Sequence, residues 1–347
     1  MRDGQEEKGV VRAFQSALDA AFAVPDASRA AEALAEATAR SLGAAHLFRG
    51  VDPLGEHLGP AALADHVLAP LARAFTRLHR REDIFFAGAN QMDGGTGLWV
   101  VSMGHLVGLF DAPWLSIRPT GKMAFLRYAS FYRVEAGRIA ETAFFCDIPH
   151  LMEQAGQNPF PGQSAAHLVQ PGPLTHDGLL FDAQPPEAGA ATRALIDRMI
   201  ADLGQWQSHL PLEEELMRNW AEDMIWWGPA GIGATYTIAR YAQQHAAPFR
   251  AGFADRSPTR HVARLAEGHY GGFFGWPNFT VRPTGGFMGM PASDRTGEFR
   301  VVDIYRRAGD KLAENWVFID FLHFWKTLGV DMLARATEPA REPDATV

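Results

Sequence analysis

The residues best suited to chemistry lie in one predicted strand near the C-terminus. Alternation in that strand places four side chains on one face: Glu314, Trp316, Phe318 and Asp320. A carboxylate packed among aromatic rings loses hydration, which raises its pKa and suits it to general acid–base catalysis near neutral pH. We therefore predict that Asp320 transfers a proton. The alternative is structural, because Asp320 directly precedes a predicted helix and could cap it.

Three histidines are candidates for stabilising an oxyanion or an enolate. His105 and His269 each follow a glycine in two similar segments, and both are predicted in mid-strand. His261 precedes His269 on the same predicted hairpin, so the pair could line one pocket wall. The alternative is that these side chains are hydrogen-bonded in a core or solvated on an outer face.

A second carboxylate could work together with Asp320. Asp303 and Tyr305 alternate on the preceding predicted strand. If Asp303 were buried close to Asp320, one of the two pKa values would rise, which would provide one acid and one base.

Aromatic side chains near these residues could bind a substrate. Trp226 and Trp227 precede a Gly-Pro turn, where indole rings could stack on a flat ligand or simply pack in a core. The other residues predicted to shape an apolar pocket are Trp276, Trp316 and His323.

The chain contains an internal repeat. Residues 104–122 and 268–286 align without a gap and share 9 of 19 positions. Residues 137–156 align with residues 309–329, which matches Asp147 with Asp320. A period of this size is that of a whole domain, so we expect two copies of one fold. Asp147 then becomes the first copy's candidate for proton transfer.

Each copy begins with helices and continues with strands, which predicts an α+β fold. Three helices packed on a strongly curved antiparallel sheet would form a cone with an apolar interior. The predicted boundaries are a first domain at 1–156, a Pro/Gly-rich linker at 157–189, a second domain at 190–335 and a disordered tail at 336–347.

Composition narrows the class of protein. The formal net charge is −8 and the basic residues are scattered, which argues against a nucleic-acid or anionic-membrane partner. The single cysteine, Cys146, excludes an internal disulfide and favours a reducing, cytoplasmic compartment. No secretory signal, membrane span, dinucleotide fingerprint or defensible metal-ligand spacing is visible, so we expect no cofactor and no metal.

Three motifs of the second copy together resemble the SnoaL-like polyketide cyclases of the nuclear transport factor 2-like superfamily. They are Trp-Gly-Pro-Ala-Gly from Trp227, Arg-Pro-Thr-Gly from Arg282, and Glu-x-Trp-x-x-x-Asp ending at Asp320. The first copy matches through its own Arg-Pro-Thr-Gly from Arg118, but has Ala143 in place of the tryptophan. The resemblance implies a cone fold and a cofactor-independent aldol closure in which Asp320 and Asp147 hold the acid–base position.

The residues and the resemblance together lead to one main hypothesis. We expect a cofactor-independent lyase or isomerase that acts on a carbonyl-containing small molecule in an apolar pocket of the second copy. The alternatives are a non-catalytic binding or assembly module and a carboxylate-assisted hydrolase. We also expect the two copies to pair as a pseudo-dimer within one chain, and a homodimer of such chains is possible.

Overall fold

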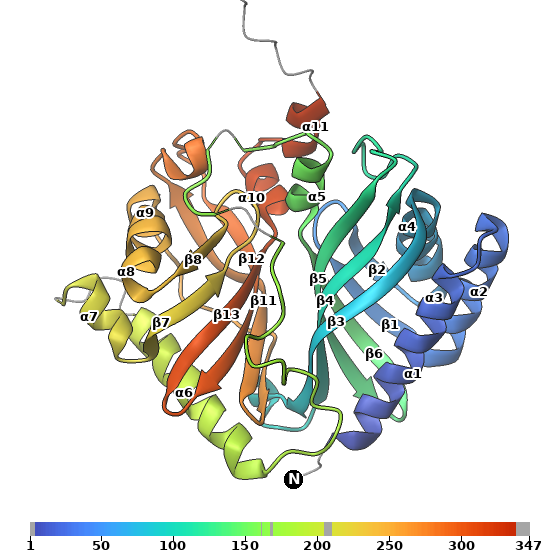
Figure 1. Ribbon diagram of the computed structural model, residues 1–347, viewed down its shortest axis with the longest axis horizontal. Coiled ribbons are helices and arrows are strands. Elements are labelled where there is room, and N and C mark those ends of the chain that lie inside the picture. The colour runs from blue at the N-terminus through green and yellow to red at the C-terminus, as the bar shows by residue number, and fades with distance from the viewer. Residues whose placement is uncertain (1–3, 161, 167–168, 205–209, 338–347) are drawn as a thin grey trace, which may run out of the picture.

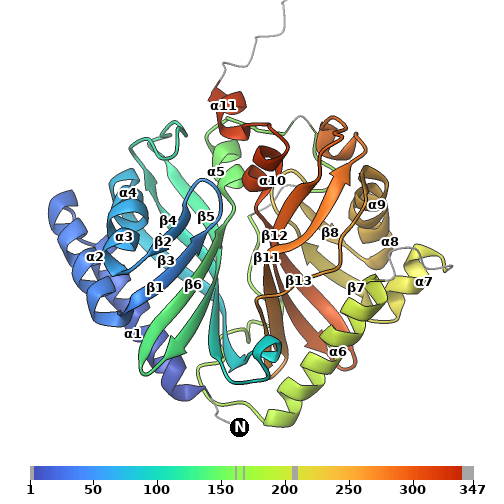
Figure 2. The same cartoon turned by 180° about the vertical axis from the view of Figure 1, so that it is seen from behind.

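The computed structural model describes residues 4–160, 162–166, 169–204 and 210–337. It contains two curved sheets, each flanked by its own helices, so the predicted α+β fold is confirmed (Figure 1). The two sheets face one another and most helices lie on the outer sides, which gives the predicted pseudo-dimer in one chain (Figure 2). Three short helices, α5 (Ile148–Gln154), α10 (Phe321–Thr327) and α11 (Met332–Thr337), lie between the two halves at one end. Among the described residues, no helix combines the length and apolar character needed to cross a membrane.

The first sheet has the strand order β2-β1-β6-β5-β4-β3, in which only β1 and β6 are parallel. Its strands are β1 (Leu42–Gly50), β2 (Gly55–Leu58), β3 (Phe75–Ala89), β4 (Leu98–Phe110), β5 (Met123–Glu135) and β6 (Arg138–Cys146). Its helices are α1 (Gln5–Phe22), α2 (Ala27–Ser41), α3 (Pro60–Leu63), α4 (Ala69–Ala74) and α5 (Ile148–Gln154).

The second sheet repeats this order as β8-β7-β13-β12-β11-β10, with β7 and β13 parallel and β9 paired to β11. Its strands are β7 (Trp220–Trp227), β8 (Ala234–Tyr236), β9 (Phe253–Ala254), β10 (Ala263–Glu267), β11 (Tyr270–Pro283), β12 (Gly297–Ala308) and β13 (Lys311–Ile319). Its helices are α6 (Pro186–Gly204), α7 (Leu212–Met217), α8 (Ile238–Tyr241), α9 (Ala247–Gly252), α10 (Phe321–Thr327) and α11 (Met332–Thr337).

Local sequence explains the helices that cover each sheet. In α1, apolar residues recur at helical spacing, and their common face is buried against the first sheet: Val11, Phe14, Leu18 and Phe22. Asp26 caps α2 by accepting a hydrogen bond from the backbone N–H of Arg29 at 2.8 Å. A π-helical turn joins α3 to α4, and another joins α8 to α9, so each domain has the same interrupted third helix.

Two helical boundaries differ from the predicted domain limits. Helix α6 begins at Pro186, inside the predicted linker, because proline is well accommodated in the first turn of a helix. Helix α11 runs to Thr337, and the rest of the predicted tail lies outside the described residues.

The linker is an ordered strap where the structure describes it. Leu179 bridges to Phe85 of the first sheet, and Ala166 bridges to Ala234 of the second sheet. Gln170 donates a hydrogen bond to the carbonyl of Gly228. The segment therefore crosses between the two sheets and covers part of their facing surfaces (Figure 1).

Strand pairing confirms one part of the repeat and corrects another. Arg133 pairs with Glu141 in the first domain and Arg306 pairs with Glu314 in the second, so Glu141 and Glu314 are structural equivalents. His105 lies opposite Arg127 within β4, whereas His269 lies in the turn between β10 and β11. The prediction that both histidines are in mid-strand was therefore wrong for His269, because β10 ends at Glu267 and β11 begins at Tyr270, so His269 belongs to the two-residue turn between them.

Candidate functional site

The second domain contains a cavity of about 160 Å³ on the concave face of its sheet. Helix α6 closes it on one side, the α8–α9 unit closes it on another, and β11, β12 and β13 form its floor. An engineered cavity of similar size, about 150 Å³, holds one benzene ring, so this space suits a ligand built on a single ring.

Asp303 of β12 supplies a carboxylate to this cavity, and it is the only Asp or Glu among the described lining residues. Nδ2 of Asn315 on β13 donates a hydrogen bond to Oδ1 of Asp303 at 3.2 Å, and Tyr305 also bonds this carboxylate. Burial raises the pKa of Asp303 to about 6, although these two hydrogen bonds act in the opposite direction. The carboxyl can therefore hold or release a proton near neutral pH.

Two histidines flank the same cavity, and each is stacked on an aromatic ring. His261 lies 3.9 Å from Phe273 between ring centroids, and His245 lies 4.0 Å from Trp226. Burial lowers the pKa of each imidazole to about 3, so both rings are neutral at physiological pH. Nε2 of His261 and Nδ1 of His245 are buried without a hydrogen-bond partner. Both atoms are therefore available to a ligand.

Asn278 adds a third polar group to the lining. Its side chain is buried, and its Oδ1 has no hydrogen-bond partner. Asn278 follows a register shift in β11 between Gly275 and Phe279, which turns its side chain out of the regular alternation. Neither Asn278 nor His245 was identified from the sequence, because a bulge and a helical face give no period-2 signal.

Several predicted binding residues do line this cavity. They are Asp303, Tyr305, Trp226 and the predicted catalytic residue His261. Burial and the adjacent Asp303 raise the pKa of Tyr305 well above its ordinary value, so its hydroxyl keeps its proton. The fold thus brings together four of the side chains that sequence reasoning had singled out, and alternation along β12 accounts for Asp303 and Tyr305.

The predicted catalytic face of β13 points away from the cavity. The residues of β13 that line the cavity are Asn315, Val317 and Ile319. On the opposite face, Nε1 of Trp316 donates to the carbonyl of Pro171 in the strap at 3.1 Å. The alternation was predicted correctly, but both faces of β13 are buried, so the pattern did not reveal which face borders the cavity.

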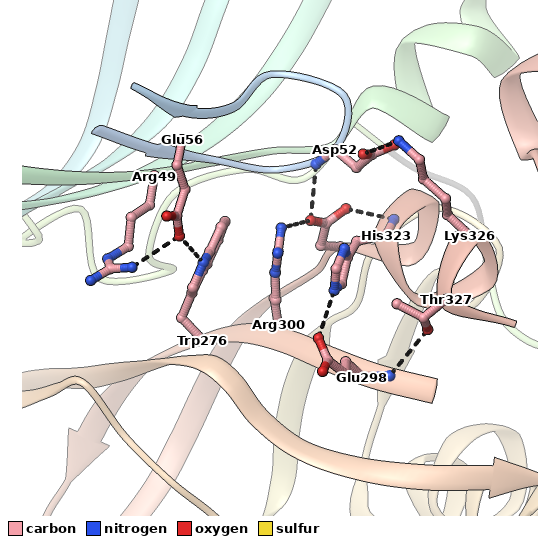
Figure 3. Close-up of polar contacts among 10 residues, drawn as sticks. Arg49, Asp52, Glu56, Trp276, Glu298, Arg300, His323, Lys326 and Thr327 are labelled. Carbon is pink, nitrogen blue, oxygen red and sulfur yellow. Dashed lines mark hydrogen bonds and ion pairs between the residues drawn. The ribbon is translucent and has the colours of Figure 1, made fainter. Parts of the chain in front are cut away.

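Asp320 lies where the two domains meet, because it bonds residues of both. Figure 3 shows its partners Asp52, Arg300 and His323. Its Oδ1 accepts the backbone N–H of His323 at 3.1 Å, which caps α10. Its Oδ2 accepts the backbone N–H of Asp52 from the first domain at 2.9 Å, and Arg300 lies 3.5 Å away. Burial raises the pKa of Asp320 to about 7. Asp320 therefore caps a helix, as the structural alternative predicted, and it also binds the first domain.

Asp147 repeats this arrangement from the other side. Its Oδ1 accepts the N–H of His150 at 3.1 Å, and its Oδ2 accepts the N–H of Ala230 in the second domain at 3.0 Å. Asp52 and Ala230 follow equivalent strands, β1 and β7. The two aspartates therefore form a reciprocal pair of contacts, each capping its own helix and binding the opposite domain.

Other predicted site residues also lie at the domain boundary. Nε1 of Trp276 donates to Glu56 of the first domain at 2.7 Å (Figure 3). His323 contacts Glu298 at 3.0 Å through Nε2, and Trp227 accepts a hydrogen bond from Arg127 at its carbonyl at 3.0 Å. None of Trp276, His323 and Trp227 is among the residues that line the cavity.

His105 and His269 are also remote from the cavity. His105 is buried in the first domain, where its Nδ1 lies 3.5 Å from a carboxylate oxygen of Asp83. His269 is exposed in its turn and contacts Arg307 at 3.1 Å. The structure thus places the predicted histidines at three separate sites, of which only His261 is in the cavity.

The first domain has a much smaller cavity, of about 50 Å³, which is lined mainly by aliphatic and aromatic side chains. Ser130 takes the place of Asp303, and Thr142 takes the place of Asn315, as the strand pairings show. Arg80 reaches into the cavity, 3.2 Å from Asp19. The first domain therefore lacks the acid of the second domain and most of its space.

Within the described part of the chain, no group of three or more His, Cys, Asp or Glu side chains is placed to hold a metal ion.

Comparison with known families bears on the second domain. Residues 276–328, which include Asn278, Asp303, Asn315 and Asp320, match the family model of the SnoaL-like polyketide cyclases. This part of the second domain is similar to the SnoaL-like polyketide cyclases. The resemblance seen in the sequence motifs is thereby confirmed. No curated protein matches the chain.

Solved structures of this kind are similar to parts of the chain. A nuclear transport factor 2-like protein from Burkholderia xenovorans LB400 is 17% identical, with a TM-score of 0.32, and the match covers 40% of this chain and 97% of its own. A candidate SnoaL-like polyketide cyclase from Jannaschia sp. CCS1 is 17% identical over 43% of this chain and 92% of its own, with a TM-score of 0.32. IdmH of Streptomyces antibioticus, a candidate polyketide cyclase, is 21% identical over 39% of this chain and 98% of its own, with a TM-score of 0.31.

Proposed function

We propose that the SnoaL-like second domain is a cyclase-type lyase or isomerase that moves a proton next to a carbonyl group of a small molecule. The observation that carries this proposal is the position of Asp303, a carboxyl with a pKa of about 6 inside the cavity. A general base works best when its pKa lies near the operating pH, because it is then ionised yet still able to hold the proton that it takes.

The proposed reaction begins with proton removal from the carbon beside the carbonyl. The ionised Asp303 takes this proton, and the electron pair moves to the carbonyl oxygen to give an enolate. A neutral imidazole, His261 or His245, would donate its N–H to that oxygen. The enolate carbon then bonds to a second carbonyl of the same molecule, and the protonated Asp303 returns its proton to the new alkoxide.

Asn315 and Tyr305 would position the base. Each bonds the carboxylate of Asp303, and Asn315 is itself fixed by a hydrogen bond to the carbonyl of Ile304 at 3.1 Å. Two such contacts restrict rotation of the carboxylate and keep one oxygen directed at the ligand. The first domain lacks both the acid and its amide donor, so we assign it a structural role.

The match to the family includes both Asp303 and Asp320, so it does not choose between them. Asp320 already accepts two backbone N–H groups and lies beside Arg300. The geometry therefore favours Asp303 as the base and leaves Asp320 as the residue that the capping alternative describes.

Proton exchange in deuterated water tests this function. Wild-type protein would be incubated with a panel of 1,3-dicarbonyl compounds and cyclic β-keto esters, and loss of the α-proton signal would be followed by NMR. We expect Asp303→Asn to reduce exchange at least a hundredfold, because general-base catalysis contributes a factor of this order. Tyr305→Phe should reduce exchange less and leave the fold unchanged by circular dichroism.

The opposite result has a clear meaning. Binding of these compounds without any catalysed exchange would favour the non-catalytic binding module. Catalysed exchange that survives Asp303→Asn would contradict the assignment of the base.

A further inference from the structure

Asn278 carries a buried polar group that the proposed reaction does not use. Its side chain belongs to the lining of the second-domain cavity, and the residue is only 3% exposed. No N–H or O–H group among the described residues donates to its Oδ1. An amide oxygen accepts hydrogen bonds and cannot donate one. Because a buried acceptor without a donor costs free energy, this oxygen favours a ligand that brings a donor.

The backbone around Asn278 fixes its place in the cavity wall. Asn278 lies within the register shift of β11, between Gly275 and Phe279. Its backbone carbonyl accepts a hydrogen bond from the N–H of Arg260 at 2.6 Å. A Cβ at position 275 would lie 2.4 Å from the Cα of Asn278, so this close approach of the chain to itself requires glycine. The bulge therefore has a defined backbone from which the amide is presented.

The other polar groups of the cavity complement a carbonyl, and Asn278 does not. His261 and His245 are neutral, and a neutral imidazole has one N–H donor and one acceptor nitrogen. In the proposed reaction, an imidazole N–H bonds the carbonyl oxygen and Asp303 takes a proton from carbon. Neither step supplies a donor to Asn278. A ligand whose polar groups are all carbonyls would place a second acceptor against its Oδ1.

We propose that Asn278 determines specificity by accepting a hydrogen bond from a hydroxyl group that the substrate carries in addition to its carbonyl. The substrate class is then a hydroxylated single-ring carbonyl compound, because a cavity of about 160 Å³ has room for one ring. An ammonium group would pair with the charged carboxylate of Asp303 instead. The inference rests on the proposed function only for the carbonyl end of the ligand, since the hydroxyl contact does not depend on which residue is the base.

Calorimetric titration with paired ring compounds tests this contact without any turnover. The probes are 3- and 4-hydroxybenzaldehyde and their fluoro counterparts, in which a fluorine of similar size replaces the hydroxyl and cannot donate. The carbon beside each carbonyl has no proton, so exchange cannot occur. At pH 6.5, where both hydroxyl groups keep their protons, we expect wild type to bind at least one hydroxyl compound at least tenfold more tightly than its fluoro counterpart. Asn278→Leu should remove this preference, and the exposed control Asn158→Leu should keep it.

Further arms separate the possible outcomes. The fluoro compounds should bind Asn278→Leu at least as tightly as wild type, which shows that the variant keeps its cavity, and the smaller Asn278→Ala should lose the preference in the same way. Asp303→Asn should keep the preference even though it abolishes exchange, so a wrong assignment of the base would leave this result unchanged. A preference that survives both Asn278 variants would assign the hydroxyl to another acceptor. That result, equal binding within each pair by wild type, or no binding of the hydroxyl compounds at millimolar concentration would each overturn the proposal.

Discussion

At the scale of single residues, the chemistry of this protein depends on which carboxylate is exposed to a ligand. Asp303 and Asp320 are both buried acids with raised pKa values, about 6 and about 7. A raised pKa alone does not distinguish them, because burial causes both shifts. Asp303 lines a cavity beside two neutral imidazoles, whereas Asp320 is surrounded by backbone donors of two domains.

The pKa of Asp303 predicts the pH dependence of turnover. The base is ionised above its pKa, so the exchange rate should rise with pH and level off above an apparent pKa of about 6. The neutral histidines titrate near 3 and should not appear in this range. A profile of exchange rate between pH 4.5 and 8 measures this. A profile that is flat across this range would show that Asp303 is not the base.

The raised pKa of Asp303 also predicts how the stability of the fold depends on pH. The folded-state pKa of Asp303 lies above the ordinary value of 3.8 for this side chain, so the folded state favours the protonated acid. Its contribution to stability is therefore present at low pH and is lost as the pH rises from about 4 through about 6. Urea unfolding of Asp303→Asn should show a smaller loss of stability over that interval than wild type does. If the free energy of unfolding fell equally with pH in wild type and in Asp303→Asn, the raised pKa of Asp303 would be contradicted.

At the scale of elements, strand β13 shows what sequence can and cannot provide. Its alternation predicted correctly that Glu314, Trp316 and Phe318 share a face, whereas Asp320 lies just beyond the strand as the N-cap of α10. The choice of face failed because the second domain packs on the first, so large apolar side chains cover both sides of the strand. Alternation also grouped Asp303 with Tyr305, and these two do reach the cavity. Asn278 lies in a bulge and His245 in a π-helical turn. Neither the two-residue period of a strand nor the 3.6-residue period of an α-helix holds there.

Helix α10 provides a test of the capping function of Asp320. Asp320→Ala should lower the free energy of unfolding by about 2–4 kcal/mol, because it removes a helix cap and a buried acceptor for the N–H of Asp52. Asp320→Asn keeps an acceptor oxygen and should cost less, with exchange activity retained. Urea denaturation of the two variants, with the exposed Asp26→Ala cap as a reference, measures this. Loss of exchange in a fully folded Asp320→Asn variant would return the catalytic role to Asp320.

At the scale of the whole molecule, the two domains share buried polar contacts that hold them as one unit. Arg127 of the first domain donates to the carbonyls of Val317 and Trp227 in the second at 2.9 and 3.0 Å. Lys8 of α1 bonds Glu267 of β10 at 2.6 Å, and both side chains are buried. The repeat predicted two copies of one fold, but these contacts join residues with no sequence relation, so no pattern could have revealed them.

The Lys8–Glu267 pair tests the strength of this domain contact. Lys8→Met should cost about 3–5 kcal/mol at pH 7, because it leaves the Glu267 carboxylate buried without its cation. Arg40→Met removes an exposed pair with Glu36 and should change stability by less than about 0.5 kcal/mol. Thermal and urea unfolding compare the two. The loss of stability in Lys8→Met should become smaller as the pH falls and Glu267 takes up a proton. A loss that does not depend on pH would show that it is not caused by the buried charge of Glu267.

The central claim is that the second domain performs its chemistry with Asp303 in the cavity, and the most direct test compares two variants in one experiment. Deuterium exchange of a 1,3-dicarbonyl substrate would be measured for wild type, Asp303→Asn and Asp320→Asn at pH 7.5. Our account predicts loss of exchange in Asp303→Asn and near-normal exchange per folded molecule in Asp320→Asn. The reverse pattern, with exchange lost only in Asp320→Asn, would contradict it.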